Sequence, residues 1–322
     1  MKRIFCSIAA AMVIFSTITL PGLAAELLIP VGEIIGLQLY DNTVTVAAFD
    51  DALGGSAREA GLMIGDEILT VNGQRICSRE DIHAALGSGK EPVSVTVQRG
   101  DKAHTLTITP QPSPDGPRLG IYLRQGIAGI GTVTWYDPET GRFGTLGHGV
   151  SNARGGLLEM TGGKAFEAEI GSVKKGKCGQ PGQLKGCAEG DEPCGILTKN
   201  TPQGVFGISH DGWDGQPIPV AEFEEVKTGA ASIRSTVRED SPREYSVEIL
   251  KIYPQDRQDG RNFLIKVTDP ALLDATGGIV QGMSGSPIIQ DGKLVGAVTH
   301  VLVNDPTRGY GIFIENMLDA AG

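Results

Sequence analysis

This chain of 322 residues has few aromatic residues and few cysteines, and its positively charged side chains are outnumbered by negatively charged ones. Aromatic residues make up 5% of it, there are five cysteines, and 28 Lys and Arg stand against 38 Asp and Glu, for a formal net charge of −10. Binding of nucleic acid or of an anionic membrane surface needs clustered Lys and Arg, so this balance argues against both classes of function.

The uncharged run nearest the N-terminus is too short for a relaxed transmembrane helix. It extends for 17 residues from Ile4 to Leu20, after Lys2-Arg3 and before the small residues Ala24-Ala25. A spanning helix needs roughly 20 apolar residues. We therefore predict that residues 1–25 are a signal peptide that is removed, in preference to a retained membrane anchor, and that the bulk of the protein is exported.

Four cysteines remain after export, and three of them, Cys178, Cys187 and Cys194, lie in a stretch rich in Gly, Pro and Lys. Their irregular spacing lacks the close pair that is typical of a zinc site. We expect neither a metal nor an organic cofactor. In an oxidising compartment the cluster allows one disulfide, and the sequence leaves its pairing open.

The chain is rich in glycine, and its length and its content of apolar residues are sufficient for the hydrophobic cores of about two domains. It contains 46 glycines and is 40% hydrophobic. Abundant glycine with few aromatic residues fits short strands joined by many turns. The fold class that we predict is mainly β.

The first module, residues 30–110, has short strands by alternation and β-branched content. They are 44–46, 68–71, 93–97 and 105–108. Two short helices interrupt them: Ser56 to Glu59 has the pattern of a capping box, and Ser78 begins a helix that ends at Leu86 before Gly87.

Three motifs of this module resemble a PDZ domain of the bacterial protease-associated type. They are Gly55 to Leu62, Gly65 to Leu69, and Val71-Asn72-Gly73. The resemblance implies that Ile35-Gly36-Leu37 forms a loop whose amides receive a peptide terminus or strand, which is then added as an edge strand. Ile82 and Leu86 would line the side-chain pocket, or else be plain core residues of their helix.

Four prolines, Pro110, Pro112, Pro114 and Pro117, mark a stiff polar connection. We take residues 111–118 as a linker that lets the PDZ-like unit move relative to the module that follows.

The second module, residues 119–322, consists of short apolar runs separated by glycine and turn residues. They include 129–136, 249–253, 263–267 and 294–298. Long amphipathic helices are absent from the pattern. A predominantly antiparallel barrel or sandwich is the economical interpretation.

The segment Gly282 to Pro287 is the candidate for the catalytic nucleophile, because it places Ser284 between glycines at a sharp bend. A serine hydroxyl needs a base, and the oxyanion that forms needs donors. We predict Ser284 as nucleophile, His148 as general base and Asp269 as the carboxylate that orients it. The N–H groups of Gly282 and Ser284 would form the oxyanion hole.

Each of these residues has a competitor. The bend could be an ordinary tight turn before a strand, Ser286 is a second hydroxyl in it, and His300 is a rival base inside an apolar run. Asp269 precedes a proline and could simply begin a turn. Other carboxylates that could take its place are Asp211, Asp214 and Asp274.

The whole second module resembles the peptidases typified by stage IV sporulation protein B, family S55. The matching segments are 131–138, 144–149, 226–229, 276–287, 296–301 and 304–313. The resemblance implies a chymotrypsin-like β-barrel serine peptidase and puts the family's catalytic residues on His148, Asp269 and Ser284. Lys174 to Cys194 is where the chain departs most from the family pattern.

The resemblance further implies a secreted serine endopeptidase that acts between forespore and mother cell and is membrane-associated at first. It would cut a membrane-associated regulator of an intramembrane protease, thereby activating a late sporulation sigma factor, and would cleave itself near its N-terminus. Two other functions remain open: an inactive PDZ adaptor that only binds, and an extracytoplasmic serine esterase.

Overall fold

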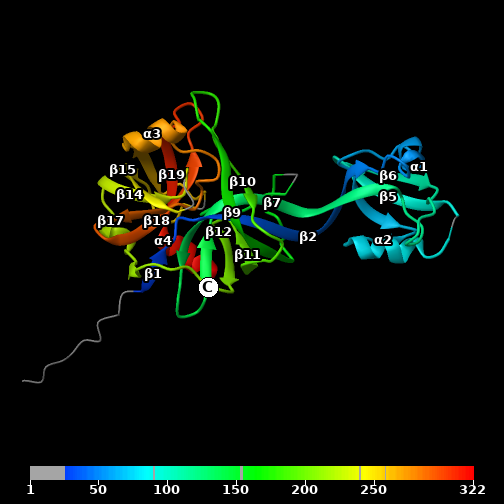
Figure 1. Ribbon diagram of the computed structural model, residues 1–322, viewed down its shortest axis with the longest axis horizontal. Helices are drawn as coiled ribbons and strands as arrows, with labels where there is room; N and C mark the ends of the chain where they lie inside the picture. The colour runs from blue at the N-terminus through cyan, green and yellow to red at the C-terminus, as the bar shows by residue number, and fades with distance from the viewer. Residues whose placement is uncertain (1–25, 90, 153–154, 239–240, 258) are drawn as a thin grey trace, which may run out of the picture.

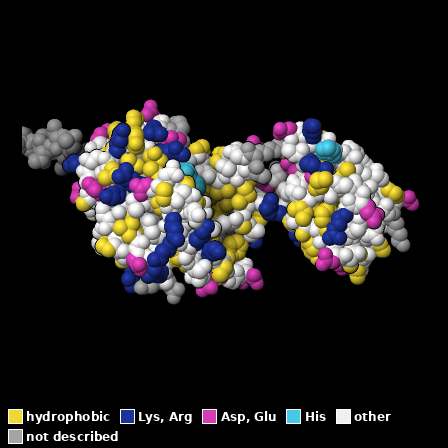
Figure 2. Space-filling view, turned by 90° about the horizontal axis from the view of Figure 1, so that it is seen from above, with side chains coloured by type: hydrophobic (Ala, Val, Ile, Leu, Met, Phe, Trp, Pro, Cys, Tyr) yellow, Lys and Arg dark blue, Asp and Glu magenta, His cyan; other side chains and the backbone are white. Residues whose placement is uncertain are grey.

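The computed structural model describes residues 26–89, 91–152, 155–238, 241–257 and 259–322. The predicted signal peptide, residues 1–25, lies outside the described residues. Figure 1 shows a large lobe and a small lobe joined by two long strands, β2 (Ile34–Phe49) and β7 (Ile121–Tyr136). Figure 2 shows the waist between the lobes, with acidic and basic side chains spread over both.

The first half of the large lobe is a ring of six antiparallel strands. Its members, in spatial order, are β2, β7, β8 (Arg142–Thr145), β12 (Gly204–Ser209), β11 (Gly195–Thr201) and β9 (Gly162–Lys174), and β9 closes the ring by pairing with β2. Three short strands flank the ring: β1 (Leu27–Pro30), β10 (Gln183–Ala188) and β13 (Ile218–Pro219). We call this ring the first barrel.

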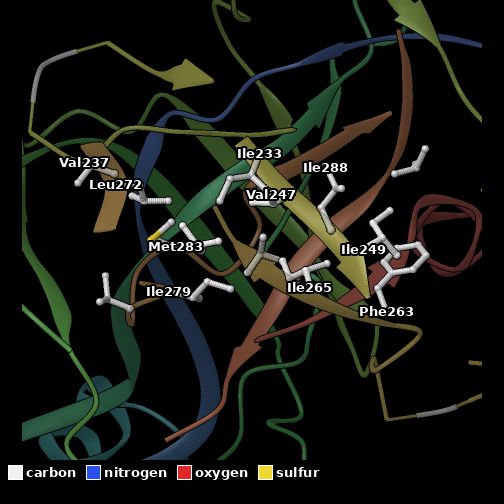
Figure 3. Close-up of a cluster of buried hydrophobic side chains, with 14 of the residues drawn as sticks. Ile233, Val237, Val247, Ile249, Phe263, Ile265, Leu272, Ile279, Met283 and Ile288 are labelled. Atoms are coloured by element: carbon white, nitrogen blue, oxygen red, sulfur yellow. The ribbon is translucent and has the colours of Figure 1, made fainter. Parts of the chain in front are cut away.

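The second half is a closed barrel of six strands. In spatial order these are β14 (Gly229–Ser235), β15 (Arg243–Ile252), β16 (Phe263–Val267), β19 (Arg308–Phe313), β18 (Lys293–Val301) and β17 (Pro287–Gln290). Three short helices complete it: η1 (Phe223–Glu225), α3 (Pro270–Thr276) and α4 (Ile314–Ala321). Alternation sends Phe263, Ile265 and Val267 of β16 inward, where they meet the apolar side chains of the other strands (Figure 3).

The small lobe is a compact unit with a core of its own. It contains α1 (Gly55–Glu59), β3 (Glu67–Val71), β4 (Gln74–Arg75), α2 (Arg79–Leu86), β5 (Val93–Arg99) and β6 (Lys102–Ile108), together with the end of β2 and the start of β7. We call it the PDZ unit. Its strands and helices fall where the alternation and the end signals predicted them, although α1 starts at Gly55 without the predicted cap from Ser56.

A buried ion pair fixes the Gly61 to Asp66 turn of the PDZ unit. The side chain of Asp66 is 1% exposed and accepts bonds from Arg99 Nε at 2.8 Å and Nη2 at 2.7 Å. Arg99 also donates to the carbonyl of Gly61, and Met63 N donates to Asp66. Burial alone would raise the pKa of Asp66, but these hydrogen bonds outweigh it and hold the pKa below its usual value.

The structure differs from the predicted domain boundary at the start of the PDZ unit. Residues Ile34 to Tyr40 pair with β7 and β9 and belong to the first barrel. The PDZ unit is therefore inserted between two strands of that barrel. Two paired strands connect it to the large lobe, where the sequence predicted one proline-rich linker.

Candidate active site

The nucleophile loop, Gln281 to Ser286, leads into β17 of the second barrel. Gly282 and Gly285 have φ of +99° and +96°, which only glycine adopts without strain. A methyl group on Gly285 would lie 2.0 Å from the carbonyl oxygen of Thr132. Met283 is fully buried among the core side chains (Figure 3), whereas Gly282 and Ser284 beside it are partly exposed.

The amides of this loop fall into two groups. Those of Gln281, Met283, Gly285 and Ser286 each donate to a backbone carbonyl. The N–H groups of Gly282 and Ser284 have no acceptor among the described residues. Two free donors two residues apart, on either side of a buried anchor, are the arrangement that an oxyanion hole requires.

Thr132 of β7 holds the loop from the first barrel. Its N–H donates to the carbonyl of Ser284 at 2.9 Å, and its hydroxyl donates to the carbonyl of Gly282 at 2.8 Å. Thr132 is buried and in turn accepts from the hydroxyl of Thr145. The sequence does not point to Thr132, because nothing in a β-strand pattern marks a contact 150 residues away.

His148 follows β8 through a strained turn. Leu146 has φ of +68°, which is uncommon for a residue with a side chain, and Gly147 has +66°. A methyl group on Gly147 would lie 2.9 Å from the side chain of Thr299, so glycine is required for the close approach of the two barrels. This turn delivers the imidazole to the interface between them.

The imidazole of His148 is oriented by its own neighbour. Its Nδ1 lies 3.0 Å from the carbonyl oxygen of Gly149. A carbonyl can only accept, so the neutral ring donates from Nδ1 and keeps a lone pair on Nε2. Burial lowers the pKa of His148, against the opposing effect of the Gly149 carbonyl. The ring is therefore neutral at pH 7 and can act as a base.

Ser284 and His148 each contact one of two consecutive residues near the end of β18, Thr299 and His300. The hydroxyl of Ser284 donates to the carbonyl of Thr299 at 2.8 Å, and the ring centroids of His148 and His300 are 5.2 Å apart. The structure thus brings the predicted nucleophile and base to two consecutive residues. In this arrangement the hydroxyl is bonded to Thr299 and not to the imidazole.

His300, the rival base, is poorly placed to accept a proton. Burial, followed by the charges of His148 and Arg261, lowers its pKa to about 4. Its Nδ1 is buried and has no partner among the described residues. Ser286, the second hydroxyl, is fully buried and bonded to Ser235 at 3.0 Å.

The structure contradicts the predicted orienting role of Asp269. This residue is the N-cap of α3 and accepts from the amides of Ala271 and Leu272 at 2.9 and 3.0 Å. It lies beyond the far end of β16, whereas Gly260, just before that strand, adjoins the carbonyl of Gly147. A five-residue strand is about 16 Å long, so the carboxylate is remote from the imidazole.

Another carboxylate, that of Asp259, directly precedes Gly260, the residue that adjoins the carbonyl of Gly147. Its charge acts on His300, but it is bound to Arg257 by bonds of 3.1 and 2.6 Å. No motif in the sequence marks Asp259.

The predicted peptide-binding residues are not available to a peptide. Ile35, Gly36 and Leu37 lie within β2 and are paired on one side with β7 and on the other with β9, so their amides are inside a sheet. Ile82 and Leu86 are 5% and 6% exposed and belong to the core of the PDZ unit, which is the plainer of the two roles considered for them.

The cysteines and the remaining features give no further catalytic group. Cys77, Cys178, Cys187 and Cys194 are free thiols, and burial raises the pKa of Cys194 to about 11. Within the described ranges, no group of three His, Cys, Asp or Glu side chains could hold a metal ion. Across the same residues, no helix has the length and apolarity that a membrane span needs.

Comparison with known proteins gives two family matches. The model of the SpoIVB peptidase S55 family matches residues 116–318, and the PDZ domain model matches residues 34–109. R01501 of Rhizobium meliloti (strain 1021), named as a zinc metalloprotease, is 30% identical over 124 residues, which are 38% of this chain and 31% of the relative. A protein of Haemophilus influenzae named as a periplasmic serine protease of the do/HhoA-like type is 34% identical over 101 residues, 26% of this chain and 21% of the relative.

Among solved structures, the active form of the Rv3671c protease from M. tuberculosis covers 61% of this chain and 75% of its own, with 16% identity and a TM-score of 0.38. The chain spans less than a third of the length of the two curated relatives, at 31% and 21%. The match to the S55 family model is more extensive than these matches to curated relatives, since it covers well over half of this chain. The chain belongs to the SpoIVB peptidase S55 family and carries a PDZ domain in front of its peptidase region.

Proposed function

We propose that this protein is a serine endopeptidase in which Ser284 is the nucleophile and His148 the general base. The observation that carries the proposal is the convergence of the two residues on Thr299-His300, beside the unpaired N–H groups of Gly282 and Ser284. The family match over residues 116–318 supports it.

The reaction starts with rotation of the Ser284 hydroxyl from the Thr299 carbonyl toward Nε2 of His148. The imidazole removes the proton as the oxygen attacks the scissile carbonyl, and the N–H groups of Gly282 and Ser284 stabilise the oxyanion. His148 then protonates the leaving amine, and a water molecule hydrolyses the acyl-enzyme by the same route in reverse.

The Gly149 carbonyl does for His148 what a carboxylate does in a common triad, as far as tautomer and orientation are concerned. It holds Nδ1 as a donor and lies 3.0 Å away. It carries no full charge, so it stabilises the imidazolium less than a carboxylate would.

We infer that the PDZ unit supplies an edge for an extended peptide or protein segment. The start of β7, residues 121–125, pairs with β2 on one side, and its other edge has no strand partner among the described residues. Gln125 donates to the carbonyl of Cys77, which places this edge beside the start of α2. Strand addition at such an edge is a common mode of peptide capture.

We propose for this protein the biological role that the resemblance to the S55 family implies. The protein would be exported, act between forespore and mother cell, cleave a regulator of an intramembrane protease so that a late sporulation sigma factor is activated, and process its own N-terminal region. Family membership supports this role, and so does the leader pattern of residues 1–25.

One observation favours a second candidate, a PDZ adaptor without turnover. The Ser284 hydroxyl is bonded to Thr299 in the structure, as it would be in a resting or inactive site. An esterase with the same site is the third candidate, since acyl transfer does not require an amide.

The test is hydrolysis of a folded protein substrate and of a small acyl ester by wild type and by Ser284→Ala. An endopeptidase cleaves internal peptide bonds, and the variant, with its fold intact, loses activity by several orders of magnitude. Cleavage of the ester alone would make the protein an esterase. Absence of both activities in folded wild type would favour the adaptor.

A further inference from the structure

The hairpin formed by β9 and β10 starts in the first barrel and is fastened to the second. The first residues of β9 pair with β2 and β11, whereas residues 168–174 pair only with β10 among the described strands. In Figure 1 the hairpin (green) rises beside α3 of the second barrel. Near its turn, Gly176 N donates to Thr276 at 2.7 Å and Gly179 N donates to Val303 at 2.9 Å.

Two more backbone bonds join the hairpin to the nucleophile loop itself. Gln281 N donates to the carbonyl of Gly182 at 3.0 Å, and Leu184 N donates to the carbonyl of Gln281 at 2.8 Å. The side chain of Leu184 is fully buried in the core of the second barrel. A methyl group on Gly282 would lie 3.0 Å from its Cβ, so Leu184 also packs directly against Gly282.

The bond to Gln281 has a geometric consequence for the neighbouring donor. The carbonyl of Gln281 and the N–H of Gly282 belong to one planar trans peptide unit and point in opposite directions. When Leu184 N holds that carbonyl, the direction of the Gly282 N–H is set. On the other side of Met283, Ser286 N holds the Met283 carbonyl at 3.0 Å and sets the Ser284 N–H in the same way.

We propose that the Gly182 to Leu184 segment of the hairpin is a positioning element for the oxyanion hole, with Leu184 fixing the Gly282 N–H. This inference rests on the proposed function, because it assigns a role within that reaction. One of the two oxyanion donors is therefore aligned from within its own barrel, and the other by a hairpin rooted in the opposite barrel. The stretch Lys174 to Cys194, which matched the family pattern least well, contains this segment.

A substitution at Gly182 can displace this segment while leaving all reacting groups chemically unchanged. A methyl group there would lie 2.4 Å from Gly176 N, 2.5 Å from the side chain of Val280 and 2.6 Å from the carbonyl of Lys174. Gly182→Ala therefore forces the hairpin away from Val280 and Gln281. Gly171→Ala is the matched control, since its methyl group would have a nearest contact of 3.7 Å.

The experiment measures kcat and KM on a peptide substrate, and the affinity for a peptide boronic acid, whose tetrahedral adduct places a hydroxyl at the oxyanion position. We expect Gly182→Ala to lower kcat by about 10²-fold, the scale of one lost oxyanion donor, and to leave KM within about threefold. Boronate affinity should fall in parallel with kcat. Gly171→Ala should match wild type in all three quantities.

A folded Gly182→Ala protein with kcat within about twofold of wild type would overturn the inference, as would a rise of KM alone. Should the variant fail to fold, amide hydrogen exchange in the wild-type protein tests whether Leu184 N holds the Gln281 carbonyl. The Leu184 amide should be as protected as that of Gly285, and an exchange rate like that of an exposed loop would refute the bond. Failure of the proposed function is distinct, because wild type itself would then show no Ser284-dependent turnover.

Discussion

At the scale of single residues, the sequence could single out Ser284 and His148 as candidate nucleophile and base because each one lies in a backbone setting that its own neighbours in sequence create. Glycines flank Ser284 and His148, and the structure uses them for positive φ and for close approach between the barrels. Asp269 could not be judged in this way. A carboxylate before a proline serves equally as a helix cap or as a catalytic group, and only the fold distinguishes the two.

The capping role of Asp269 leads to a sharp expectation. Asp269→Asn should keep activity within about threefold, because asparagine caps a helix as well as aspartate does. Asp269→Ala should lower the free energy of unfolding by about 1 kcal/mol. A carboxylate that orients the catalytic imidazole would behave differently, with kcat falling by about 10⁴ on the change to asparagine. Steady-state kinetics of the two variants separate the roles.

The pH dependence of kcat/KM should report the buried imidazole. His148 acts in its neutral form, so kcat/KM rises with pH through its pKa, and burial puts that pKa below the ordinary 6.5. We expect half-maximal kcat/KM at a pH lower than 6.5 in the free enzyme. A midpoint at 7 or above would contradict the assigned environment.

At the scale of elements, alternation and end signals predicted most strands and helices of the PDZ unit. Ser78 forms the full capping box with Asp81 at the start of α2. The pattern could not reveal which strands pair. Residues 34–40 alternate like any half-buried strand, and the sequence does not say that both of their edges are occupied by β7 and β9. This is why the prediction that Ile35-Gly36-Leu37 forms a peptide-binding loop does not agree with the structure.

Breaking the ion pair between Asp66 and Arg99 should destabilise the PDZ unit. Arg99→Gln leaves a buried carboxylate without its cation and should lower the free energy of unfolding of this unit by about 3 kcal/mol. Arg118→Gln is the control, since Arg118 and Asp115 form an exposed pair 2.7 Å apart, with 45% and 75% of their side chains accessible. Exposed pairs contribute about 0–1 kcal/mol. Urea unfolding followed by hydrogen exchange in residues 61–66 measures both, and equal losses would contradict the account.

At the scale of the whole molecule, the sequence predicted two domains and a mainly β chain, and the structure confirms the fold class. It could not predict that the PDZ unit is inserted into the first barrel, because proline content marks a boundary without showing a second connection. The consequence is mechanical. Two paired strands connect the lobes, and the pairing is interrupted between Leu39 and Val44, opposite Gly126.

Gly126 is therefore expected to control how the lobes are held. Its φ is +75°, and a methyl group there would lie 1.9 Å from the carbonyl oxygen of Leu39. Gly126→Ala should open the ribbon at this point and broaden the distribution of distances between the lobes, as measured by small-angle X-ray scattering. Gly129→Ala, whose methyl group would meet nothing within 4 Å, should scatter as wild type does. Indistinguishable curves for the two variants would contradict a hinge at Gly126.

The central claim is that Ser284 and His148 form one reactive site across the interface of the two barrels. Its most direct test is labelling with a fluorophosphonate, with the modified residue identified by mass spectrometry. We expect the label on Ser284 in wild type, and a labelling rate at least about 10³-fold lower in His148→Ala, because the hydroxyl then lacks its base. A label on another serine, or an equal rate in folded His148→Ala, would contradict the account.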